Sequence, residues 1–217
     1  MAKIEDGASG AILAGVDAGS RALRVSPRPL DGFGHYRFAG ATGILAAVPA
    51  NSEIFQFRWT DAQAVGLLQF LRIRCTQVAA FSAPQELSME LIASTGFVAA
   101  GTGGTQWLPT AQSFKKRSIM PQSRVNELRI ATTAALGPGT RNLAPTPLLC
   151  HFGWAGGAGQ AVIDTTLDLT SSSVEYPFVL HQNEGIAVRF GQTGMGAVGT
   201  VRISVEMAWA ELAASSI

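Results

Sequence analysis

The side chains that could carry catalysis or bind a metal are few and scattered along this sequence. Its histidines are His35, His151 and His181; none has a second histidine at the i,i+4 spacing of a helical metal site, and no HExxH motif occurs. A serine-histidine-aspartate triad can form from residues far apart in a chain, but no GxSxG motif points to its nucleophile. We therefore expect structural histidines, no catalytic residue, no metal and no enzyme activity.

Two further sequence features could bind a ligand: a pair of aspartates and two glycine-rich stretches. Asp164 and Asp168 could form a carboxylate pair, but they precede a turn-rich TSSS stretch, which favours a role in capping or solvating a loop. The glycine-rich stretches GTGG and AGGAG neither continue to GK[ST] nor open a helix, so they do not fit a phosphate-binding loop. No cofactor is expected.

The two cysteines, Cys75 and Cys150, form neither a disulfide framework nor a CxxC motif. Each lies in an apolar stretch, which indicates a buried, reduced thiol. The N-terminal stretch MAKIEDGASG contains acidic residues where a signal peptide needs a basic start followed by an apolar core, and no apolar run approaches the roughly 18 residues of a membrane helix. These features predict a protein that is made in a cytoplasm and does not enter a membrane.

Charged residues make up only 14% of the 217 residues, whereas hydrophobic residues make up 47%. Because a typical domain is about 25% charged, the chain either buries an unusually large fraction of its surface or meets other protein. Its net charge of +1 predicts no general attraction to nucleic acid or to anionic lipid.

The elements that would position any site are strands. In the stretch 201–209, apolar residues alternate with polar or small ones, and a similar alternation covers 186–190. Side chains alternate between the faces of a strand, so each stretch has one buried face. The glycine-rich link GQTGMGAVG between them predicts a hairpin with a long loop.

Further strands are expected along the middle of the chain. The stretch 43–60 predicts two strands joined by a turn at 49–52, with Phe55, Phe57 and Trp59 on one face. That aromatic row favours core packing over a carbohydrate platform. The stretch 61–73 is ambiguous between helix and strand, and its β-branched and aromatic flanks favour a strand.

About eight strands at regular spacing predict an all-β fold, an antiparallel sandwich with a jelly-roll-like arrangement over residues 41–217. Residues 1–40 instead predict an extended N-terminal arm, because they are rich in small residues and Pro27 and Pro29 favour extended backbone. An arm that docks on a neighbouring subunit is the favoured interpretation, with a flexible terminus as the alternative. The residues expected to make the contact are Arg21, Arg24, Pro27, Arg28, Pro29, Phe33 and Tyr36.

Several sequence segments, in their order along the chain, resemble accessory structural proteins of tailed bacteriophages. These segments are GVDAGSRALRVSPRPLD, GHYR, FRWT, LRIRC, ELRIATTAALGPGTRNL, EYPFVLHQNEGIAVR and VEMAWAE, and they extend from about Val16 to Glu211. The resemblance implies a virion component with a β-sandwich core and an N-terminal arm, and it transfers no catalytic residue.

What the resemblance implies about function is a head decoration or cement protein. Such a protein would bind the major capsid protein and copies of itself, often as a homotrimer, within the virion. A tail, baseplate or fibre-adaptor protein would share this fold, and the sequence does not separate the two. A carbohydrate-binding or receptor-binding module is a further alternative, which depends on Trp107, Trp154 and the long glycine loops.

Overall fold

A computed structural model of the chain describes residues 4–6, 10–12, 34–110, 113–116, 120–155, 162–168 and 178–214. The chain divides into two units, Met1–Leu30 and Asp31–Ile217. In the first, β1 (Ile4–Asp6) pairs antiparallel with β2 (Gly10–Ile12). No helix in the described residues could span a membrane.

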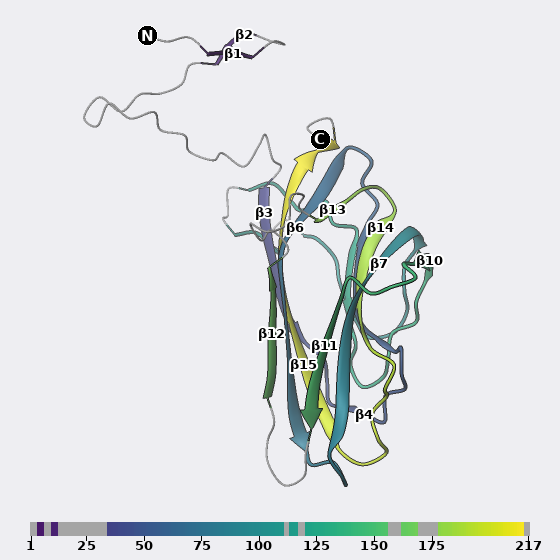
Figure 1. Cartoon of the computed structure of the whole chain (residues 1–217). Helices are drawn as coiled ribbons and strands as arrows, with labels where there is room; N and C mark the ends of the chain where they lie inside the picture. Colours follow the sequence, from purple (N-terminus) through teal and green to yellow (C-terminus); the bar gives the residue numbers. More distant parts are fainter. Residues whose placement is uncertain are drawn as a thin grey trace, which may run out of the picture. The chain divides into compact units, whose positions relative to one another are not determined.

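The described part of the second unit contains two antiparallel sheets that face one another (Figure 1). The first, here called the seven-stranded sheet, has the order β10-β7-β14-β5-β9-β8, and β11 also pairs with β7. Its strands are β5 (Glu53–Trp59), β7 (Gln85–Ala99), β8 (Thr105–Trp107), β9 (Glu127–Ile130), β10 (Thr140–Leu143), β11 (Leu149–Ala155) and β14 (Glu184–Phe190).

The second, here called the six-stranded sheet, has the order β12-β6-β15-β3, with β13 on β6 and β4 on β15. Its strands are β3 (Gly34–Ala41), β4 (Leu45–Ala46), β6 (Ala64–Ala79), β12 (Val162–Asp168), β13 (Phe178–Leu180) and β15 (Thr200–Ala213). Both sheets confirm the predicted all-β, antiparallel sandwich.

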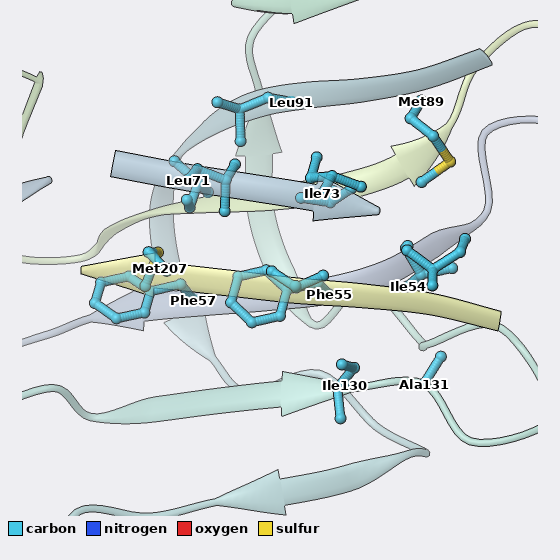
Figure 2. Packing of buried hydrophobic residues seen from close by; sticks show 14 of the residues in the cluster. Ile54, Phe55, Phe57, Leu71, Ile73, Met89, Leu91, Ile130, Ala131 and Met207 are labelled. Atoms are coloured by element: carbon cyan, nitrogen blue, oxygen red, sulfur yellow. The ribbon is translucent and has the colours of Figure 1, made fainter. Parts of the chain in front are cut away.

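The core lies between the sheets and follows from the alternation of apolar residues. Phe55, Phe57 and Trp59 of β5 are fully buried, which confirms the core interpretation of this aromatic row. Figure 2 shows Phe55 and Phe57 of β5 and Leu91 of β7 gathered with Leu71 of β6 and Met207 of β15. Burial of apolar surface on two facing sheets is what stabilises such a fold.

The ambiguous stretch 61–73 is a strand from Ala64 onward. The carboxylate of Asp61 accepts hydrogen bonds from the backbone N–H groups of Gln63 and Ala64, at 2.8 and 3.0 Å, and so closes the turn before β6. From there β6 pairs with β15 along almost its whole length. The predicted turn at 49–52 is also present, because β4 and β5 flank it.

The predicted hairpin between 186–190 and 201–209 is wrong. Strand β14 pairs with β5 and β7, whereas β15 pairs with β3, β4 and β6, so the two strands belong to opposite sheets. The link 191–199 crosses from one sheet to the other and is held by backbone hydrogen bonds to the β4–β5 turn, such as Met195 N to Val48 O at 2.8 Å. Two strands with one apolar face each can bury those faces against one another across a sandwich as well as side by side.

Candidate functional site

The predicted arm contacts divide into two groups. Arg21, Arg24, Pro27, Arg28, Pro29 and Phe33 lie outside the described residues. Tyr36 belongs to β3, where its side chain is fully buried and stacks on Trp209 with ring centroids 5.7 Å apart. Residues 34–40 therefore form an edge strand of the sandwich, and the assignment of Tyr36 to an arm surface is corrected. Its aromatic ring, which would be costly to leave in water, packs in the protein's own core.

The histidines and aspartates that could take part in catalysis belong to several elements, and His151 lies in β11. The ring of His35 in β3 contacts the side-chain amide of Gln69 in β6, and His181 is exposed after β13. Asp164 and Asp168 lie in β12, not in a loop as we expected. Within the described part of the chain, no three histidine, cysteine, aspartate or glutamate side chains gather where they could hold a metal ion.

Cys75 is a buried free thiol, as predicted. Burial raises its pKa to about 12, so the thiol stays protonated near neutral pH and has little nucleophilic character. Cys150 lies in β11, and its side chain is outside the description.

The largest gathering of ionic groups lies on the outer face of the seven-stranded sheet. Here three buried glutamates pair with arginines, and we call this arrangement the polar layer. Its ion pairs are Glu53–Arg141, Glu90–Arg189, Glu127–Arg58 and Glu127–Arg129. The alternation in β5 predicts that Gln56 and Arg58 face away from the core, and they do, but Gln56 is also buried.

Two loop segments cover the polar layer. The amide of Gln56 donates to Glu53 at 2.7 Å and to the carbonyl oxygen of Gly137 at 3.0 Å. Arg129 donates to the carbonyl oxygen of Gly103 at 2.6 Å, and Arg141 lies over the ring of Phe97 at 4.5 Å. Segments 97–103 and 137–141 thus shield these charges from water. The layer is rich in charge but closed, which suits a structural role more than substrate access.

A further buried carboxylate, that of Glu211, lies near the end of β15 on the inner side of the six-stranded sheet. It accepts hydrogen bonds from the hydroxyl of Ser123 at 2.5 Å, from the backbone N–H of Arg124 at 2.9 and 3.0 Å, and from the indole N–H of Trp209 at 3.0 Å. Burial raises the pKa of this carboxyl, and the hydrogen bonds partly oppose that effect. The contacts fix segment 123–124 beside the aromatic core, and they give no path to solvent for catalysis because Glu211 is fully buried.

The surface features are of two kinds. Strand β8 lies at an edge of its sheet with all three residues exposed, and Trp107 is 45% exposed beside Leu108 at 54%. The ring of Trp107 also packs edge-on against Phe38, with centroids 5.9 Å apart. On the outer face of the six-stranded sheet, a shallow hollow of about 90 Å³ is lined by Arg72, Arg74, Ser204 and Glu206.

Sequence reasoning did not identify the polar layer, the hydrogen bonds that converge on Glu211, or the hollow beside Arg72 and Arg74. Each brings together residues from strands distant in the chain, and only the pairing of those strands makes them neighbours. Comparison with protein-family models, curated proteins and solved structures finds no significant match to this chain.

Proposed function

We propose that the chain is a virion structural protein of a tailed bacteriophage, a head decoration or cement protein that stabilises the capsid by binding neighbouring subunits. The resemblance of its sequence segments to accessory phage proteins suggests that the chain belongs to a virion. The antiparallel sandwich is the fold that this resemblance implies. The proposed partners are the major capsid protein and copies of the chain itself, in a homotrimer.

One observation carries the assembly role: ionic groups are buried while large apolar side chains remain on the surface. Glu53, Glu90, Glu127 and Glu211 are all buried, so part of the already small share of charge lies below the described surface. The exposed large hydrophobic residues are Ile44, Val78, Val98, Trp107, Leu108, Leu143, Leu148 and Val198. Of these residues, Trp107 and Leu108 lie together at the edge strand β8, and apolar side chains exposed beside an unpaired strand edge favour contact with other protein.

The edge strand β8 is the contact we assign to assembly. Its only strand partner among the described residues is β9, so its second edge can accept backbone hydrogen bonds from another chain. Trp107 and Leu108 would add apolar contact there. Residues 1–33 would add a second contact as an arm on the capsid or on the next subunit.

The test uses purified virions that lack the protein, with full-length protein added back and particles collected by sedimentation. The wild-type chain is expected to sediment with heads and to raise the temperature at which they release DNA. The Trp107→Ser/Leu108→Ser variant is expected to bind at least about tenfold more weakly, because two partly exposed anchors are lost. Val198→Ser is the matched control, since Val198 is also exposed but lies in the 191–199 link.

A chain lacking residues 1–30 tests the arm without removing β3. We expect it to stay folded and to lose particle binding. Normal binding by this chain would refute the arm, and signal on tails alone in labelled virions would replace the head role by the tail or baseplate role.

A carbohydrate-binding role has one observation in its favour, the half-exposed Trp107. An exposed indole can stack on a sugar ring. A glycan array would detect such binding, and a Trp107→Ala variant should abolish it while Leu108→Ala preserves it. An array without any signal would dispose of this alternative.

A further inference from the structure

The outer face of the six-stranded sheet carries a group of arginines that we call the arginine face. Its members are Arg37 of β3, Arg72 and Arg74 of β6 and Arg202 of β15, with Glu206 among them. Backbone register places Glu206 opposite Arg72 and Ser204 opposite Arg74, and the hollow of about 90 Å³ lies between these four residues. Arg37, Arg74 and Arg202 are exposed.

Positive charge predominates on this face. Among the described side chains of β3, β6 and β15 that face outward, four arginines and one glutamate leave an excess of three positive charges, whereas the whole chain carries only +1. Glu211 of β15 is buried on the other face of the sheet and is not part of this group. Arg37 pairs with Glu206 at 3.0 Å, and that pair is largely exposed. At the edge of the sheet, β12 places Asp164 at the register position of Arg74 and Asp168 at that of Phe70.

The residue types around the charges favour a protein partner. The chain has 13 arginines and three lysines, and a guanidinium group binds a carboxylate through two parallel hydrogen bonds more readily than an ammonium group does. The exposed neighbours Ala39 and Ala41 of β3 are small, so an extended segment can approach the sheet closely. Arg72 and Arg74 also interact within the chain, so a partner's carboxylates would have to compete for them.

We propose that the arginine face docks an acidic segment of a protein partner, with carboxylates seated at the hollow between Arg72 and Arg74. This inference rests on the proposed assembly function and names the chemistry of a second contact, separate from β8. Because the charges are near the surface, the interaction is expected to weaken as salt rises.

The test measures the anisotropy of a fluorescein-labelled peptide of glutamate and serine as the full-length protein is added. Binding at low salt is expected, and the Arg72→Glu/Arg74→Glu variant is expected to weaken it about tenfold, because two attractive surface contacts become repulsive. Asp164→Asn, which removes a negative charge at the register position of Arg74, should tighten it. If the reversal variant misfolds, Arg74→Gln/Arg202→Gln, at two exposed positions, replaces it.

Three results would overturn the inference. They are no peptide binding, peptide binding that is unchanged in both Arg72→Glu/Arg74→Glu and Asp164→Asn, or equal binding of a DNA oligonucleotide of the same length. The last would indicate a general attraction to polyanions.

Failure of the arginine face is distinguishable from failure of the assembly role. If Arg72→Glu/Arg74→Glu still sediments normally with heads, the arginine face is wrong and the assembly role stands. If the chain binds the peptide as expected but never binds particles, the assembly role fails alone.

Discussion

The ion pair between Glu53 and Arg141 allows a sharp test of the polar layer. Their side chains are only 6% and 1% exposed, and a methionine at position 141 would leave the Glu53 carboxylate buried with Gln56 as its one remaining side-chain partner among the described residues. Removing one partner of a buried pair typically destabilises a protein by about 3–5 kcal/mol, because the other charge stays desolvated. We expect Arg141→Met to lower the free energy of unfolding by about that amount.

Replacing both partners should restore much of the loss. Two nitrogens of Arg141, Nε and Nη1, are buried with no hydrogen-bond partner among the described residues, so its desolvation is incompletely offset even in the native pair. In Glu53→Met/Arg141→Met no unpaired charge remains, and Gln56 keeps its bond to Gly137. We expect this double variant to recover about 2 kcal/mol or more relative to Arg141→Met.

The measurement is urea-induced unfolding followed by tryptophan fluorescence, since Trp59 and Trp209 report on the core. Arg37→Met is the matched control, because Arg37 pairs with Glu206 at a side-chain exposure of 55% and should cost about 1 kcal/mol or less. If Arg141→Met and Arg37→Met cost the same, or if the double variant is the least stable of all, the polar layer does not shield its charges as argued.

Three other predictions follow from single residues. Burial raises the folded-state pKa of Glu211 above its ordinary value of 4.5, so the stability that this group contributes is complete below pH 4.5 and is lost as the pH rises through the folded-state pKa. The unfolding free energy of wild type minus that of Glu211→Gln, measured at each pH, should therefore fall across this window. A difference that does not change with pH would contradict the raised pKa. Since the pKa of Cys75 is raised to about 12, native protein at mild alkaline pH should react with a thiol reagent orders of magnitude more slowly than protein in urea, and equal rates would show that the thiol is accessible. A Cβ at Gly101 would lie 2.0 Å from Oε1 of Gln56 and 2.5 Å from the carbonyl oxygen of Gly137, so Gly101→Ala should lower the unfolding free energy by about 1–3 kcal/mol. Gly196→Ala is the control, because a Cβ there would come no closer than 3.2 Å, to the end of the Gln85 side chain, and an equal loss in both variants would contradict the clash.

The sequence by itself determined the class of fold and much of the core. Strict alternation in β5 places Phe55 and Phe57 on one face, and a strand with one apolar face has to bury it. Local turn chemistry also predicted the turn at 49–52 that precedes β5, because its signals lie within the turn itself.

Tertiary structure decided which strands are neighbours and which polar residues are buried. Alternation defines the buried face of β14 and of β15 but not the sheet to which each belongs, so the hairpin and the sheet-to-sheet crossing fit the same pattern. Tyr36 carries no local mark that separates an arm from an edge strand; its pairing with β15, 173 positions away at Trp209, decides this. Likewise Gln56 has the pattern of a solvent-facing residue, and it is buried because segments 97–103 and 137–141 fold over it. Such contacts join residues far apart in the chain, and their energy depends on surfaces that exist only after the sheets have formed.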